Sequence, residues 1–309
     1  FSLALSSTSV SLGDGNDTIS FATSITAVSV AAGAGSDLVS MTAGVFASTL
    51  AGGADDDAFY FGSVVSSSYV SLDAGSDLLV FNSIVSGNST VLGGAGGDTL
   101  LFKSSVASGT TIDAGADNDS VYFSLALSST SVSLGDGNDT LSMASAALGV
   151  TIDAGGGTDS LVFAGAMSGT ISGLYSSNEY VSFSNGGATV QFNSAIGQGS
   201  TIQFGTSADL ATFSGAIDNT ASILGGDGGD TLDFNATVSA AYIAAGSGAD
   251  SLDFDNSGVG AATIDAGADN DSMTFGGAVA GARIDAGGGT DRLVFAGAMS
   301  GTISGLYSS

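Results

Sequence analysis

The sequence contains no cysteine, histidine, tryptophan or proline. Without cysteine it has no disulfide bonds or thiolate metal sites, and without histidine it lacks the commonest general base. Only Lys103, Arg283 and Arg292 are basic, against 30 acids, so the formal net charge is -27. Phosphate binding needs clustered Lys and Arg, so nucleic acids and anionic membranes are not expected partners. No apolar run approaches the roughly 20 residues that cross a bilayer.

What the chain does contain is a repeat. The residues from Leu12 to Phe21 are Leu-Gly-Asp-Gly-Asn-Asp-Thr-Ile-Ser-Phe, and variants of this stretch return with a period of roughly 20 residues. We call the last acid of each turn the marker acid. The aspartates at this position are Asp17, Asp37, Asp57, Asp77, Asp98, Asp119, Asp139, Asp159, Asp230, Asp250, Asp271 and Asp291. Two weaker turns, at Glu179 and Asp209, lie between the two series.

Apolar residues keep fixed places relative to each marker. In the first coil they are Val10, Ile19, Phe21 and, more loosely across the coils, Ile25. Apolar positions two residues apart lie on one face of a strand, and the glycine, serine and β-branched content disfavours helix. One coil cannot bury these residues, but stacked coils can. The sequence therefore predicts an all-β fold, a parallel β-solenoid (β-roll or β-helix) of about 14–15 coils with two short strands per coil and the Gly-Asp turns stacked along one edge.

The domain prediction is a single continuous solenoid over residues 1–309, cut from a longer repetitive chain. Phe1 to Thr18 is identical to Phe123 to Thr140, which indicates internal duplication. The spacing from Glu179 to Asp209 is about ten residues longer than the others, which suggests one coil with an insertion around Asn185 to Ser200. The expected segments are regular coils at 1–177, an irregular coil with an insertion at 178–210, and regular coils at 211–309.

The turn from Gly93 to Leu100, Gly-Gly-Ala-Gly-Gly-Asp-Thr-Leu, resembles the nonapeptide repeat of the RTX (hemolysin-type calcium-binding) family, as does the turn from Gly225 to Leu232. The resemblance implies calcium ions between stacked turns, held by Asp carboxylates and turn carbonyls. The usual family coil carries two such turns in about eighteen residues. This chain has one turn per coil, similar to the one-sided calcium solenoids of some giant RTX adhesins, which implies a single row of calcium ions along one edge.

The residue types suit a cation. Glycine permits tight turns, and calcium takes six to eight oxygens from carboxylates and carbonyls. Marker carboxylates stacked about 4.8 Å apart would also repel one another without a cation. The alternative is that each aspartate only caps its turn and binds no metal. We expect Asp55, Asp117 and Asp269, which replace a turn glycine, to distort their turns, and the turns at Glu179 and Asp209 have too little glycine to be included. The predicted ligands are the twelve marker aspartates together with Asp14, Asp73, Asp113, Asp136, Asp153, Asp227, Asp265 and Asp285.

An enzyme is not expected, because nearly every aspartate repeats in register, which is typical of an architectural role. The non-repeating segment with Gln191, Gln198 and Gln203 is the one place for an unrepeated site. The sequence favours an extracellular calcium-binding structural protein that self-associates into a filament, surface layer or matrix fibre. The alternative is the extender stalk of a large secreted RTX adhesin at the cell surface, with cell-surface polysaccharide or other matrix components as further partners. An ice-binding solenoid and a polysaccharide-active β-helix enzyme are weaker alternatives.

Overall fold

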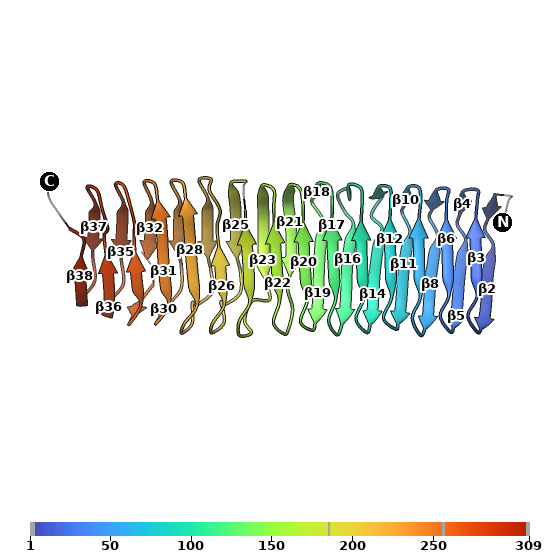
Figure 1. The fold of residues 1–309 in the computed structure, drawn as a ribbon, viewed down its shortest axis with the longest axis horizontal. Coiled ribbons are helices and arrows are strands. Elements are labelled where there is room, and N and C mark those ends of the chain that lie inside the picture. The colour runs from blue at the N-terminus through green and yellow to red at the C-terminus, as the bar shows by residue number, and fades with distance from the viewer. Residues whose placement is uncertain (1–3, 185, 255–256, 307–309) are drawn as a thin grey trace. The chain divides into compact units, whose positions relative to one another are not determined.

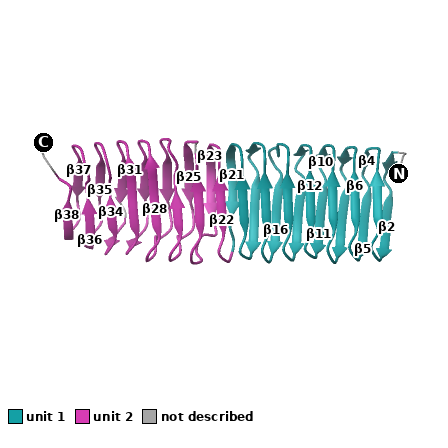
Figure 2. Cartoon of the chain, viewed as in Figure 1, with its two compact units in different colours: residues 1–155 teal, residues 156–309 magenta. Residues whose placement is uncertain are grey.

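The computed structural model describes residues 4–184, 186–254 and 257–306. These residues form short β-strands joined by turns (Figure 1). The chain divides into two compact units, Phe1–Gly155 and Gly156–Ser309, coloured teal and magenta in Figure 2. In the part of the chain that is described, no helix is long and apolar enough to cross a membrane.

Unit 1 is a stack of parallel coils. The longer strand before each marker acid is β2 (Ser9–Asp14), β5 (Ser29–Ala34), β8 (Thr49–Ala54), β11 (Tyr69–Ala74), β14 (Thr90–Ala95), β16 (Thr111–Ala116), β19 (Ser131–Asp136) or β21 (Ala147–Asp153). The four-residue strand after each marker is β3 (Thr18–Phe21), β6 (Leu38–Met41), β9 (Ala58–Phe61), β12 (Leu78–Phe81), β15 (Thr99–Phe102), β17 (Ser120–Phe123) or β20 (Thr140–Met143). Most coils add a two-residue strand: β1 (Leu5–Ser6), β4 (Ile25–Thr26), β7 (Val45–Phe46), β10 (Val65–Ser66), β13 (Val85–Ser86) or β18 (Leu127–Ser128).

The strands of unit 1 pair in register, so equivalent positions of successive coils are neighbours. Thr18 pairs in parallel with Leu38, its equivalent in the next coil, and Leu78 pairs with Thr99 in the same way. The predicted parallel solenoid and its period are confirmed. The prediction of two strands per coil missed the third, two-residue strand, whose first residue is the loosely repeated apolar position represented by Ile25. Sequence periodicity cannot reveal a strand this short, because alternation needs more than two residues.

Unit 2 has two facing layers of strands, each paired in parallel. The first layer contains β22 (Ser160–Phe163), β24 (Tyr180–Phe183), β26 (Thr201–Gln203), β28 (Ser222–Asp227), β30 (Val238–Ser239), β31 (Tyr242–Ser247), β33 (Val259–Gly260), β34 (Thr263–Asp265), β36 (Val279–Asp285) and β38 (Met299–Ser304). The second layer contains β23 (Met167–Ser172), β25 (Ala188–Phe192), β27 (Leu210–Phe213), β29 (Thr231–Phe234), β32 (Ser251–Phe254), β35 (Ser272–Phe275) and β37 (Arg292–Phe295).

The segment predicted to hold an insertion is a half-turn of the solenoid. The strand after Glu179, β24, pairs with β26, which precedes Asp209. The strand after Asp209, β27, pairs with β25 and through it with β23, which precedes Glu179. The extra residues therefore complete half a coil and do not bulge from one coil. Asn185, within this segment, lies outside the described residues.

This half-turn changes which edge of unit 2 carries the acidic turn. At Glu179 the chain passes from the second layer to the first, and at Asp209 it passes from the first layer to the second. Identical sequence then lies in opposite layers, since Leu161 to Phe163 is in β22 and Leu293 to Phe295 is in β37. The prediction that all the Gly-Asp turns stack along one edge is wrong for unit 2.

Stacked phenylalanine rings fill the core of both units. In unit 1 the rings of Phe61, Phe81, Phe102 and Phe123 stack with centroids 4.7, 5.0 and 4.7 Å apart. Burying each ring contributes roughly 1.5–3 kcal/mol.

In unit 2 the half-turn splits the phenylalanine column into two stacks. Phe163, Phe183 and Phe204 form one stack, and the series from Phe192 to Phe295 forms the other. The two stacks meet edge-to-face where Phe192 and Phe204 lie 6.5 Å apart. Phe204 holds a position taken elsewhere by Leu, Ala or Gly, so the ring follows the layer and not the sequence column.

Candidate metal centre

The marker carboxylates form a ladder along the turns. The backbone N–H of Asp77 donates to Oδ1 of Asp98 (2.8 Å), and the N–H of Asp98 donates to Oδ1 of Asp119 (2.7 Å). The same bond links each pair of successive markers from Asp17 to Asp139. Each carboxylate thus caps a turn amide of the preceding coil, as the turn-capping alternative requires.

In the part of the chain that the structure describes, the second carboxylate oxygen of most marker acids accepts no hydrogen bond. The side chains are buried, with Asp98 only 1% exposed. Burying an acceptor without a partner costs about 1–3 kcal/mol, and more if it is charged. The buried oxygens without a hydrogen bond among the markers are Oδ2 of Asp37, Asp57, Asp77, Asp98, Asp119, Asp139, Asp159, Asp209, Asp230, Asp250 and Asp271, and Oε1 of Glu179.

Burial favours the neutral form of these acids. The pKa of Asp98 is raised from 3.8 to about 7, mainly by burial and to a lesser extent by the neighbouring charges on Asp77, Asp119 and Asp117, against the lowering effect of the hydrogen bond from the N–H of Asp77. The pKa of Asp230 is raised to about 7 for the same reasons. A buried carboxylate row with raised pKa values needs either protons or cations.

The turn on the other side of unit 1 is capped in a different way. The N–H of Ser48 donates to Oγ of Ser68, and the hydroxyl of Ser68 donates to the carbonyl of Ser66 (2.9 Å). Ser89 likewise accepts from the N–H of Ser68 and donates to the carbonyl of Ser86. A hydroxyl both accepts and donates, so it caps the turn with no oxygen left unpaired. This ladder was not among the predictions, and the signal that could have revealed it is the small hydroxyl residue that recurs nine positions before these markers.

Unit 2 carries marker carboxylates on both of its edges. The N–H of Asp159 donates to Oε2 of Glu179 (2.6 Å), and the N–H of Glu179 donates to Oγ of Ser200, where this row of acids ends. On the opposite edge, Asp209 accepts from the N–H of Ala188 and donates its own N–H to Asp230. This second row continues to Asp291. The prediction of a single row of calcium ligands along one edge is therefore wrong for unit 2.

Glu179 and Asp209, which the glycine content left out of the prediction, are equivalent to the other markers. Both are buried, and each leaves one oxygen unpaired. The signal that identifies them is the apolar residue two positions later, Val181 or Ala211, and not the number of glycines. Asp17 and Asp291 belong to the same rows but are half-buried.

The eight other predicted ligands face away from the core. Asp113 lies between Ile112 and Ala114, which are both buried, so its own side chain points outward. Asp73 accepts from Ser71, and Asp285 pairs with Arg283 (3.1 Å). The acids on outward-facing or exposed turn positions are Asp14, Asp73, Asp113, Asp136, Asp153, Asp227, Asp265 and Asp285.

The turns with aspartate in place of glycine are not distorted, contrary to expectation. Asp55, Asp117 and Asp269 have φ of 74°, 77° and 80°. This left-handed conformation is open to aspartate because its short side chain bonds locally. The coil containing Asp117 keeps full register with the next one, with Gly115 paired to Gly135.

The oxygen atoms available along the marker rows are ligands of the kind that a hard cation prefers. Among the described residues, no three acidic side chains cluster closely enough to hold a metal ion by themselves. A bound ion therefore needs main-chain carbonyls and water besides at most two acidic side chains. Carboxylate and carbonyl oxygens suit Ca²⁺ or Mg²⁺ and do not suit softer metals. The unpaired oxygens fit such an ion in charge and in donor type.

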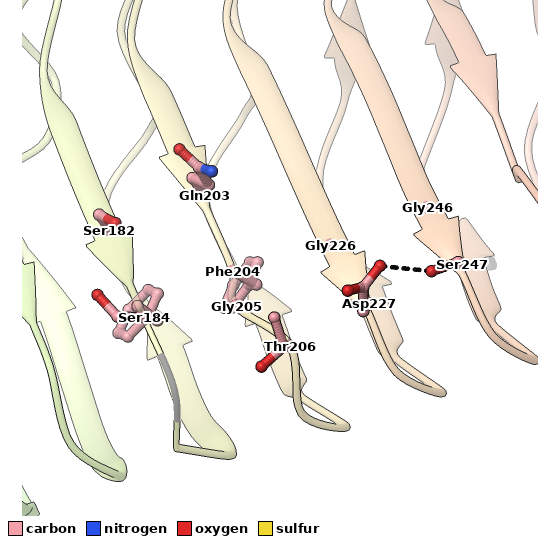
Figure 3. Close-up of a pocket in the computed structure, with 11 residues that line it drawn as sticks. Ser182, Ser184, Gln203, Phe204, Gly205, Thr206, Gly226, Asp227, Gly246 and Ser247 are labelled. Atoms are coloured by element: carbon pink, nitrogen blue, oxygen red, sulfur yellow. Dashed lines mark hydrogen bonds between the residues drawn. The ribbon is translucent and has the colours of Figure 1, made fainter.

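An open hollow of about 590 Å³ lies on the first layer of unit 2, near the half-turn (Figure 3). Ser182, Gln203 and Thr206 line it, and Asp227 accepts a hydrogen bond from the hydroxyl of Ser247 there. Asp227 is the one ionisable group among the described residues that line the hollow. The hollow therefore offers no acid–base pair.

Comparison with known proteins adds one structural likeness. No family model matches the sequence, and no curated protein matches it. A solved structure described as a hyperactive, Ca²⁺-dependent, β-helical antifreeze protein from an Antarctic bacterium is similar over 85% of this chain and 83% of that chain, with 19% identity and a TM-score of 0.35. A likeness of this strength assigns neither a family nor a function.

Proposed function

We propose that this chain is an extracellular structural protein whose coils are stabilised by calcium ions bound along the marker carboxylates, and that it self-associates into a filament, surface layer or matrix fibre. The observation that supports calcium is the series of buried carboxylate oxygens without a hydrogen bond, such as Oδ2 of Asp57, Asp98 and Asp230. Each is a buried acceptor that a proton, a donating water molecule or a cation can satisfy, and the negative charge of the carboxylate favours the cation.

The two kinds of turn in unit 1 provide an internal comparison. Ser68 and Ser89 cap their turns with every hydroxyl atom paired. Aspartate at the other turn makes the same cap but adds an unpaired buried oxygen. Capping alone does not account for aspartate, because serine performs it at lower cost. A cation ligand does account for it.

Electrostatics favour occupancy of these sites. Carboxylates about 4.8 Å apart repel by about 3.5 kcal/mol per neighbouring pair at an effective dielectric of 20. The formal net charge of -27 adds to this repulsion. Bound calcium would neutralise the rows, and carbonyls from adjacent coils would share the ion, so binding would couple to folding.

A structural role agrees with the repetition. Coils that repeat in register present the same backbone and the same core in every turn, which is the property of a solenoid scaffold. The marker acids recur as a series and lack the pairing of two unlike groups that acid–base catalysis uses. The second candidate is the extender stalk of a large secreted RTX adhesin, which has the same architecture with its ligand-binding domain elsewhere.

The test is circular dichroism with electron microscopy, on protein stripped of calcium by a chelator and then restored. We expect the β-sheet signal to fall in chelator and return with calcium, and fibres or layers to appear only with calcium. Monomeric particles with a calcium-dependent β-sheet signal would favour the stalk. A β-sheet signal that is unchanged in chelator would contradict the calcium proposal.

A further inference from the structure

We infer that the residue five positions before each marker acid selects which carboxylates bind calcium tightly, and that the tight sites are those of Asp57, Asp98 and Asp230. The inference rests on the proposed function, since it assigns sites within the proposed calcium rows. Its basis is the space that glycine leaves beside the unpaired oxygen.

The residue five positions before the marker points into the core. Ala114, Leu134 and Phe204 occupy this position in three coils and are at most 2% exposed. In most coils an apolar side chain fills the space behind the turn. The exceptions among the described coils are Gly52, Gly93 and Gly225, which precede Asp57, Asp98 and Asp230.

At these glycines, two oxygens from different coils face the same small space. A Cβ added to Gly52 would lie 2.5 Å from Oδ2 of Asp57 and 2.5 Å from the carbonyl oxygen of Leu72 in the next coil. A Cβ added to Gly93 would lie 2.5 Å from Oδ2 of Asp98 and would overlap the carbonyl oxygen of Ala114.

Gly225 shows the same arrangement. A Cβ there would lie 2.8 Å from Oδ2 of Asp230 and would overlap the carbonyl oxygen of Ala245. Three separate coils, in both units, therefore pair a glycine with an unpaired carboxylate oxygen and a carbonyl.

The chemistry of the carboxylate oxygen and the carbonyl oxygen beside each glycine determines what can bind between them. Both oxygens are acceptors, so they cannot bond to each other directly. At Gly52 they are no more than twice 2.5 Å apart, a separation that a calcium ion bridges at its usual distance of about 2.3–2.6 Å from each oxygen. A water molecule, which donates two hydrogen bonds, is the competing occupant. The buried negative charge of the marker favours the cation.

In the other coils, the side chain of the residue five positions before the marker fills this space. Ala32 precedes Asp37 and Ala114 precedes Asp119, and both alanines are fully buried. Their methyl groups take the place in which the ion would lie. These coils also show that the fold accepts alanine at the position, which makes the glycine and alanine coils matched controls within one chain.

The experiment counts calcium ions per chain by equilibrium dialysis and atomic emission, in salt that screens the outward acids. We expect three ions for the natural sequence, two for Gly93→Ala and four for Ala114→Gly, which opens a site at Asp119. Gly288→Ala, where an added Cβ meets nothing within 4 Å, should leave the count unchanged. Circular dichroism in calcium confirms that each variant folds.

The outcomes separate this inference from the proposed function. If the natural chain binds calcium but Gly93→Ala and Ala114→Gly leave the count unchanged, the glycines do not select the sites, and water fills the space. If the natural chain binds no calcium, the proposed function fails as well. Should Gly93→Ala not fold, a fourth ion in Ala114→Gly still supports the inference, and its absence overturns it.

Discussion

The substitution Asp98→Asn tests the role of the unpaired oxygen, because it keeps the cap and removes the charge. Asparagine is the same shape, and its Oδ1 can still accept from the N–H of Asp77, which the aspartate does at 2.8 Å. In place of the unpaired Oδ2, the amide presents two N–H donors toward the space that the carbonyl of Ala114 also lines. The variant therefore loses the carboxylate and nothing else.

The expected magnitude follows from the burial of Asp98. A pKa raised from 3.8 to about 7 opposes folding at pH 8 by about 4 kcal/mol at most, at roughly 1.4 kcal/mol per tenfold change in proton affinity. An unpaired buried acceptor alone costs about 1–3 kcal/mol. In chelator we therefore expect Asp98→Asn to be more stable than the natural chain by about 1–3 kcal/mol. In calcium the sign should reverse, because the variant has lost a ligand.

The assay is urea unfolding at pH 8, in chelator and in calcium, followed by circular dichroism. Ser89→Ala is the control at the other turn, since it removes a cap without touching a carboxylate. Its effect should be the same in both solutions. If Asp98→Asn changes stability by the same amount in chelator and in calcium, then calcium does not contact Asp98 and the reasoning is refuted.

Three further predictions follow from the same structure. Phe102→Ala, in the middle of the ring stack, should cost about 3–5 kcal/mol in urea unfolding, and a cost under about 1 kcal/mol would show that the stack is not part of a tightly packed core. In chelator, the melting temperature should fall as pH rises from about 4 to 7, because the folded state holds protons on Asp98 and Asp230 that the unfolded chain releases near 3.8. Calcium should reduce this dependence of the melting temperature on pH. The same pH profile in calcium and in chelator would argue against calcium binding at these two aspartates. Gly94→Ala should destabilise by about 1 kcal/mol or more, since Gly94 has φ +127° and an added Cβ would overlap the carbonyl of Asp73, so stability equal to the natural chain would be a contradiction.

The fold was largely predictable from the spacing of apolar residues. Apolar residues recur at the positions represented by Val10, Ile19 and Phe21, at fixed distances from each marker. That repetition is enough to indicate stacked parallel coils. The half-turn was not predictable in the same way. The long spacing between Glu179 and Asp209 fits either an insertion or one and a half coils, and only strand pairing distinguishes them.

The candidate site was predictable in its residue types but not in their orientation. Sequence alone grouped Asp98 with Asp113, although one is buried with an unpaired oxygen and the other faces outward. Strand alternation relative to Ile112 would have separated them, because Asp113 is the next residue on the opposite face. The space beside Gly93 depends on the neighbouring coil, so no pattern within one coil reveals it.

The most direct test of the account is a crystal structure of the chain grown in calcium, with anomalous difference maps to locate the ions. The account predicts peaks about 2.3–2.6 Å from Oδ2 of marker aspartates, with Asp57, Asp98 and Asp230 occupied first. Maps without peaks along the marker rows, or with peaks only at outward acids such as Asp113, would contradict the central claim that calcium satisfies the buried carboxylates.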